Sequence, residues 1–133
     1  MTQRHLLRMR VAWQTDRLAA CDRFYAEALG LPVLARFDEH AGYDGLVLGL
    51  PGSEAQLELT AHRDGSPASP SAPDDLLVLY LVDRAVALAA RDRCLAAGGV
   101  AVEPDNPYWD GRAVLVCDPD GRRVVLDWGL AED

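Results

Sequence analysis

The sequence predicts an α+β fold built from two tandem βαβββ modules. One observation is the turn signal Asp118-Pro119-Asp120-Gly121 between apolar runs at 113–117 and 124–126, a pattern typical of a β-hairpin. The other is an internal repeat, because an offset of 67 residues places Trp13 on Tyr80 and aligns the ends of two predicted helices. If a helix covers one face of each half-sheet, the other faces are expected to enclose a cavity within a curved mixed sheet.

The first module is expected over residues 8–62. Residues 10–15 alternate as a strand does, and Thr15 or Asp16 is placed to cap a helix that runs to about Leu29. Gly30 and Pro32 then end this helix. Three further strands are predicted, at 32–37, 45–50 and 55–61.

The second module is expected over residues 76–128, after a linker. The linker, 63–75, is rich in Pro, Ser and Asp and lacks apolar periodicity, so we expect it to be mobile. Asp83 is placed to cap a helix at 84–97, with Ala85, Leu88, Ala89 and Leu95 as its apolar stripe. Strands are predicted at 76–82, 100–103, 112–117 and 122–128, and the whole chain, 1–133, is expected to form a single domain of this type.

Composition excludes several classes of function. The net charge is −8, and all 13 basic residues are arginines scattered along the chain, so nucleic-acid binding is not expected. No apolar run reaches the roughly 20 residues that cross a bilayer, and the first residues lack a signal-peptide core. The cysteines, Cys21, Cys94 and Cys117, have no metal-type spacing and indicate buried reduced thiols in a cytoplasmic protein.

Four segments in order resemble the vicinal oxygen chelate superfamily, which includes glyoxalase I, extradiol dioxygenases, and fosfomycin and bleomycin resistance proteins. They are the runs at 24–31 (FYAEALGL), 57–60 (LELT), 96–99 (AAGG) and 118–121 (DPDG). The resemblance spans about residues 8–128 and implies the paired βαβββ fold. It does not fix the chemistry, because one fold supports many functions.

The resemblance also implies where a metal would bind, at four inward positions on the first and last strands of each module. The 67-residue offset assigns these positions to Arg10, Glu58, Leu77 and Val125. Only Glu58 has a donor atom suited to a metal, whereas Zn²⁺, Ni²⁺ or Fe²⁺ needs three or four ligands. We therefore expect no metal cofactor at these positions, which argues against the metal-dependent activities of the superfamily.

Glu58 has two interpretations. It could form a structural ion pair with Arg10, or it could accept a hydrogen bond from a ligand or act as a general base. A relocated metal site made by Glu58 with His40 and His62 is a further alternative, although a solvated or hydrogen-bonded histidine is the commoner outcome for each.

The stretch Asn106–Arg112 is the most distinctive one that the fold does not require. Tyr108, Trp109 and Arg112 could stack on a planar or cationic ligand, or the two aromatic residues could simply cover the end of the sheet. Weaker lining candidates are Gln14, Tyr43 and His62. Trp13, Tyr80 and Trp128 are expected to be packing residues.

The leading hypothesis is a metal-independent small-molecule binding protein, with antibiotic sequestration as a candidate role. The resemblance to the superfamily implies a homodimer, and the reduced thiols indicate a cytoplasmic location. The acidic net charge and the aromatic stretch are compatible with a cationic or aromatic ligand. The alternative is a glyoxalase-type lyase or isomerase that uses Glu58 with a non-standard metal site including His40 or His62. A third hypothesis is an accessory domain without a small ligand.

Overall fold

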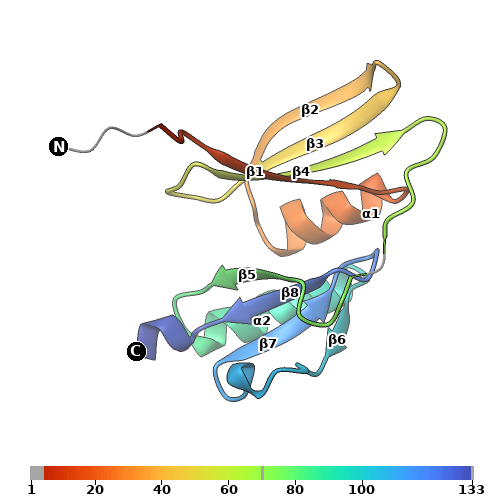
Figure 1. The fold of residues 1–133 in the computed structure, drawn as a ribbon. Helices are drawn as coiled ribbons and strands as arrows, with labels where there is room; N and C mark the ends of the chain where they lie inside the picture. Colours follow the sequence, from red (N-terminus) through yellow and green to blue (C-terminus); the bar gives the residue numbers. More distant parts are fainter. Residues whose placement is uncertain (1–4, 70, 133) are drawn as a thin grey trace. The chain divides into compact units, whose positions relative to one another are not determined.

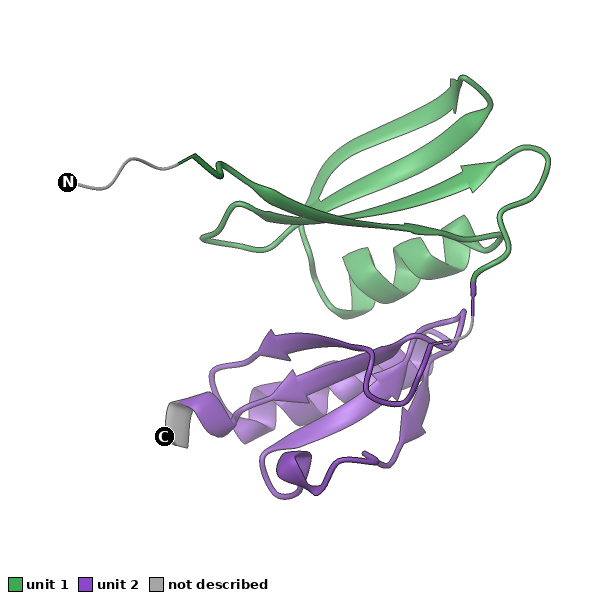
Figure 2. Ribbon diagram, viewed as in Figure 1, with its two compact units in different colours: residues 1–68 green, residues 69–133 purple. Residues whose placement is uncertain are grey.

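A computed structural model of the chain describes residues 5–69 and 71–132. It divides into two units, Met1–Ala68 and Ser69–Asp133, which repeat one architecture (Figures 1 and 2). Each unit holds a four-stranded mixed sheet with a helix packed on one face, so the predicted α+β class is confirmed. Within the described residues no helix is long and apolar enough to cross a membrane.

Unit 1 has the sheet order β1-β4-β3-β2. The first strand is parallel to the last, and the other neighbours are antiparallel. Its elements are β1 (Met9–Gln14), α1 (Leu18–Asp22), the π-helical η1 (Arg23–Ala28), β2 (Val33–His40), β3 (Tyr43–Gly49) and β4 (Ala55–His62).

Unit 2 repeats this topology with the order β5-β8-β7-β6, again with the first and last strands parallel. Its elements are β5 (Leu76–Tyr80), α2 (Arg84–Ala96), β6 (Val100–Val102), the 3₁₀ turn η2 (Pro107–Trp109), β7 (Ala113–Cys117), β8 (Arg123–Asp127) and the 3₁₀ turn η3 (Gly129–Glu132). Every predicted strand is present, within three residues at each end.

The first helix differs from the regular α-helix that was predicted. After α1 the chain widens into the π-helical η1, where the Leu29 amide bonds to the Phe24 carbonyl five residues earlier (3.0 Å). This geometry buries the adjacent rings of Phe24 and Tyr25 completely. The predicted caps are also wrong, because α1 has no side-chain cap: Thr15 Oγ1 accepts from the Arg17 amide (2.8 Å), and Asp16 accepts from the Ser66 amide.

The second helix begins as predicted, since the Val86 amide donates to Asp83 Oδ1 (2.9 Å). Its predicted apolar stripe was wrong. The buried side chains are Ala87, Ala90 and Cys94, whereas Leu95 is exposed. The small residues face the sheet because they let the helix lie close to it, over the completely buried Val116, Val124 and Leu126.

The predicted hairpin at Asp118–Gly121 is confirmed, and β7 pairs antiparallel with β8 across it. Asp118 Oδ1 accepts from the amides of Asp120 (2.8 Å) and Arg122 (2.9 Å). The buried Arg122 guanidinium lies 3.1 Å from carboxylate oxygens of both Asp118 and Asp120. The turn is therefore held by a charge network as well as by backbone geometry.

The first part of the predicted linker is tied to unit 1. The Ser66 hydroxyl accepts from the His62 amide (2.7 Å), and the Pro67 carbonyl accepts from the Gln14 side chain (2.7 Å). Ser66 is buried. Residues 63–67 thus form a hydrogen-bonded turn that closes unit 1.

Candidate functional site

Most of the predicted ligand-binding residues lie on one sheet face of unit 1, opposite α1. Strand alternation and register place β1, β3 and β4 residues on it, and we call it the helix-free face of unit 1. Its members are Arg10, Ala12, Gln14, Tyr43, Gly45, Val47, Gly49, Gln56, Glu58, Thr60 and His62. Leu46, Leu48, Leu57 and Leu59, of opposite parity, are the buried residues that α1 covers.

Arg10 and Glu58 meet at the centre of this face. Arg10 donates through Nε and Nη2 to Gln56 Oε1, at 2.9 and 2.8 Å, and its Nη1 lies 3.5 Å from Glu58 Oε2. The side chains of Arg10 and Glu58 are 41% and 19% exposed. The structural ion pair between Arg10 and Glu58 is therefore present. The hydrogen bonds from Arg10 to Gln56 are nevertheless shorter than its contact with Glu58.

The register of unit 2 corrects the assignment of Leu77. Ala12 is paired with Glu58, and Val78 is paired with Val125, so the first strands are offset by 66 residues (12 to 78) while the last strands keep 67. The counterpart of Arg10 is thus Leu76. Leu77 pairs with the fully buried Val124 and lies on the helix-covered side of its sheet.

The same register changes the interpretation of Tyr80. It pairs with Asp127 on the helix-free face of unit 2 and is 58% exposed, so the prediction of a core residue was wrong. Trp13 does lie toward the helix, with its ring 6.5 Å from that of Tyr25. Trp128 is buried, and the Arg84 guanidinium lies 5.8 Å from its ring centre, so it is a packing residue.

The donor set at the four equivalent positions does not fit a divalent metal. Arg10 is a permanent cation, Glu58 supplies one carboxylate, and Leu76 and Val125 pack in one apolar cluster. The reassignment of one of these positions from Leu77 to Leu76 does not alter this conclusion, because neither leucine has a donor atom. His40 and His62 do not complete a site either: among residues 5–69 and 71–132, no three His, Cys, Asp or Glu side chains are grouped to hold a metal ion.

Phe37 is a member of this surface that the sequence analysis missed. It lies in β2 opposite Gly45, and a Cβ at Gly45 would stand only 2.0 Å from Phe37 Cζ. Leu34 likewise covers Gly49, where a Cβ would meet its Cδ1 at 3.1 Å. Two β2 side chains thus cover glycines of β3. An isolated glycine within a predicted strand is the sequence signal that could have indicated such close packing.

Gln14 and His62 are held mainly by structural bonds. Gln14 donates to the Pro67 carbonyl, and His62 Nδ1 accepts from the Asp64 amide (3.1 Å). The His62 ring also contacts the Tyr43 ring, with centres 4.7 Å apart. His40 is exposed at the end of β2, with its ring centre 6.3 Å from that of Phe37.

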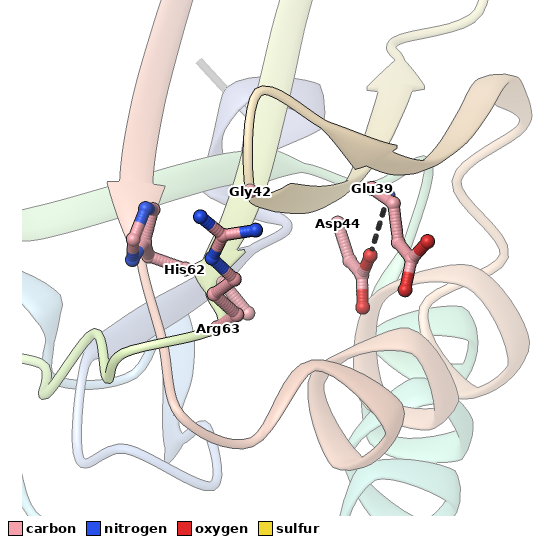
Figure 3. A pocket seen from close by; sticks show the side chains of 6 residues that line it. Glu39, Gly42, Asp44, His62 and Arg63 are labelled. Atoms are coloured by element: carbon pink, nitrogen blue, oxygen red, sulfur yellow. Dashed lines mark hydrogen bonds between the residues drawn. The ribbon is translucent and has the colours of Figure 1, made fainter.

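A hollow of about 280 Å³ is lined in part by His62, at the end of unit 1 where β3 begins and β4 ends. Figure 3 shows carboxylates of Glu39 and Asp44 on one side of it and the side chains of Arg63 and His62 on the other. Asp44 Oδ1 accepts from the Glu39 amide (2.9 Å), which fixes the turn. The hollow is open, and its charged residues Glu39, Asp44 and Arg63 are exposed.

The three candidates in unit 2 have different roles. Trp109 is 9% exposed and packs with Leu115 and Val125, so it is a packing residue. Tyr108 is exposed, and its ring lies 4.7 Å from the Arg112 guanidinium carbon, a cation–π contact within the protein itself.

Asp127 is a second residue that the sequence analysis did not single out. It is 1% exposed, its Oδ1 accepts from the Gly129 amide (2.6 Å), and Arg112 Nε lies 3.5 Å from its Oδ2. The Arg112 side chain also packs directly on Gly129: a Cβ added to this glycine would lie 2.5 Å from Arg112 Nε. Arg112 is thus fixed between Tyr108, Asp127 and Gly129.

Comparison with known proteins agrees with this two-unit architecture. Residues 9–60 match the YycE-like N-terminal domain and residues 74–127 match the YycE-like C-terminal domain. The chain is 43% identical over 119 residues to the uncharacterized protein YycE of Bacillus subtilis (strain 168), covering 89% of this chain and 85% of that protein. This chain belongs to the YycE-like family.

Solved structures place the family within the glyoxalase/bleomycin resistance fold. A crystal structure of a YycE protein of unknown function from Bacillus subtilis has a TM-score of 0.84 and 38% identity, covering 90% of this chain and 88% of that one. Leishmania major glyoxalase I gives a TM-score of 0.71 at 21% identity, covering 98% of this chain and 90% of that one. An antibiotic binding protein from Streptomyces sp. CB03234 gives 0.67 at 23%, covering 96% and 98%. At these lower identities the likeness concerns the fold alone.

Proposed function

We propose that this YycE-like protein is a metal-independent binding protein for a small organic molecule, and that it acts in the cytoplasm as a homodimer. One observation carries the proposal: the position that would supply the first metal ligand is Arg10, which is bonded to Gln56 and faces Glu58. One carboxylate and a guanidinium, which cannot coordinate, supply too few ligands for a divalent metal ion.

Antibiotic sequestration is the role that we propose for this binding. It is supported by the shared fold of the antibiotic binding protein from Streptomyces and of a glyoxalase/bleomycin resistance protein from Albidiferax ferrireducens T118. The helix-free face of unit 1 supports binding in a second way, since it presents polar groups at its centre and aromatic side chains toward the β2–β3 turn.

Elemental analysis tests the metal-independence of the protein. The protein is purified without a metal-binding tag and measured before and after exposure to Zn²⁺, Ni²⁺ and Mn²⁺. We expect well below one metal per chain under every condition. Near-stoichiometric metal that is lost in Glu58→Ala would overturn the proposal and favour glyoxalase-type lyase chemistry.

Binding itself is tested by screening small molecules against the full chain, with protein amide chemical shifts as the readout. We expect ligands to perturb amides of the helix-free face of unit 1. Light scattering across a concentration series tests the homodimer separately, and a mass of one chain at all concentrations would contradict that part of the proposal.

A further inference from the structure

We propose that the helix-free face of unit 1 selects a planar organic cation, whose charge lies on Glu58 and whose flat body lies against Phe37. The inference rests on the proposed function, because it names the ligand class of that same site. It depends on three features of the face: a carboxylate that accepts no hydrogen bond, an aromatic side chain fixed on the same face, and the position of the neighbouring guanidinium.

Glu58 is the acceptor. The Arg10 nitrogen lies 3.5 Å from Oε2, beyond the usual distance of a charge-assisted hydrogen bond. Within residues 5–69 and 71–132 no group donates a hydrogen bond to the carboxylate of Glu58, although this side chain is only 19% exposed. A partly buried carboxylate in this state gains most from a ligand that donates N–H groups to it.

Arg10 leaves one side of Glu58 open. Its Nε and Nη2 both bond Gln56 Oε1, and Gln56 precedes Glu58 by two residues on the same strand and face. The guanidinium is therefore directed toward the Gln56 side. Thr60 lies two residues beyond Glu58 in the other direction, and the Thr60 side is where a ligand can reach the carboxylate.

Phe37 stands on that open side. Gly45 pairs with Thr60 in β4 and with Phe37 in β2, and the outer end of the Phe37 ring rests on Gly45. Glu58 lies two residues along β4 and one strand across from Gly45, about 7 Å along the strand and about 4.8 Å between strands, so the backbone under the ring is roughly 8–9 Å from that of Glu58. A benzene ring with one small substituent, together with its hydrogen bond, can bridge a separation of this order. Phe37 is only partly exposed, and its packing on the glycine fixes its position.

The sign of the ligand charge follows from the same contacts. A carboxylate ligand would be repelled by Glu58, and the Arg10 guanidinium is already engaged, since its Nε and Nη2 bond Gln56 and its Nη1 pairs with Glu58 at 3.5 Å. A planar cation gains a charged hydrogen bond from Glu58 and a favourable electrostatic contact with the Phe37 ring. The net charge of −8 also raises the concentration of cations near the protein surface.

Three isosteres test the ligand class: benzamidinium, benzamide and benzoate, titrated into the ¹⁵N-labelled full chain at fixed ionic strength. We expect benzamidinium to bind most tightly and to shift the amides of Gly45, Glu58 and Thr60. Glu58→Gln should weaken benzamidinium about tenfold, the loss expected for one charged hydrogen bond, and leave benzamide nearly unchanged. Phe37→Leu should weaken it about threefold.

Glu54→Gln is the matched control. Glu54 pairs with Arg8 at 3.6 Å and its side chain is 68% exposed, so this variant makes the same charge change at the rim of the sheet. It should leave benzamidinium affinity within about twofold. Urea unfolding of each variant separates a lost contact from a lost fold, and Phe37→Tyr, which keeps the ring, should retain binding if Phe37 acts through its aromatic surface.

Tighter binding of benzoate or benzamide than of benzamidinium at this face would overturn the cation assignment and leave the proposed binding function standing. Equal weakening by Glu58→Gln and Glu54→Gln would overturn it as well, because the effect would then be one of net charge. Perturbation of this face by none of the three probes would also overturn it, while the ligand screen and metal analysis judge the proposed function independently.

Discussion

At the scale of single residues, this protein places its charged side chains in pairs whose burial differs widely. Arg122 and Asp118 are nearly inaccessible in the β7–β8 turn, whereas the Arg91–Asp92 pair lies on the surface of α2. Removal of one partner from a buried pair leaves an uncompensated charge, but an exposed pair is largely solvated. Equal substitutions at the two places should therefore have unequal effects.

Asp118→Ala should lower the free energy of unfolding by about 3 kcal/mol, because it removes one of the two carboxylates paired with the buried Arg122 guanidinium and the acceptor for two amides, while Asp120 remains as a partner. Asp92→Ala should cost no more than about 0.5 kcal/mol. Urea denaturation of both variants measures the difference. Similar midpoints would show that the turn network contributes little.

Trp109 gives a second prediction. Its indole N–H has no hydrogen-bond partner among the described residues, so its contribution should come from packing against Leu115 and Val125. Trp109→Phe should cost about 1–2 kcal/mol and Trp109→Ala about 3–5 kcal/mol, since cavity volume decides the loss. Thermal unfolding measures both. A Phe variant as unstable as the Ala variant would indicate that the indole N–H is bonded after all.

At the scale of elements, the two helices begin differently. The Asp83 side chain caps α2, whereas α1 has no side-chain cap and passes into the π-helical η1. The first helix instead depends on the tertiary contacts of Cys21, Phe24 and Tyr25, all of which are completely buried. Local capping therefore stabilises the start of α2 more than the start of α1, which depends on tertiary packing.

Asp83→Ala should destabilise the protein by about 1 kcal/mol, with loss of amide protection at the start of α2. Asp83→Ser should restore most of the stability, because serine also caps helices. Hydrogen exchange of the Val86 amide reports the cap directly. Unchanged exchange of this amide in Asp83→Ala would contradict the role of the side chain.

At the scale of the whole molecule, alkaline pH tests the burial of the thiols. Burial raises the pKa of Cys94 to about 11, and it also raises the pKa of Cys117. Because the pKa of Cys94 is higher in the folded state than the unfolded value of 9.0, the folded state favours the neutral thiol. The folded protein therefore has its full stability below pH 9 and loses part of it as the pH rises toward 11, where the buried thiol ionises.

Unfolding free energies should therefore fall between pH 9 and 11, with a slope of at most about 1.4 kcal/mol per pH unit for this one thiol. Cys94→Ala should have a shallower slope over the same range. Urea titrations at half-unit pH intervals measure both proteins. Parallel curves for the two would exclude Cys94 as the source.

The sequence by itself determined the element order, the repeat and the fold class, because turn chemistry and apolar alternation are local properties. Through the resemblance it also predicted that the four positions at which the superfamily binds a metal hold too few donor atoms. Only the tertiary structure decided the register between strands, and a one-residue difference moved the counterpart of Arg10 from Leu77 to Leu76 and brought Tyr80 to the surface. It likewise decided that Gln56 holds Arg10 and that Phe37 rests on Gly45, because these contacts join strands that the sequence separates.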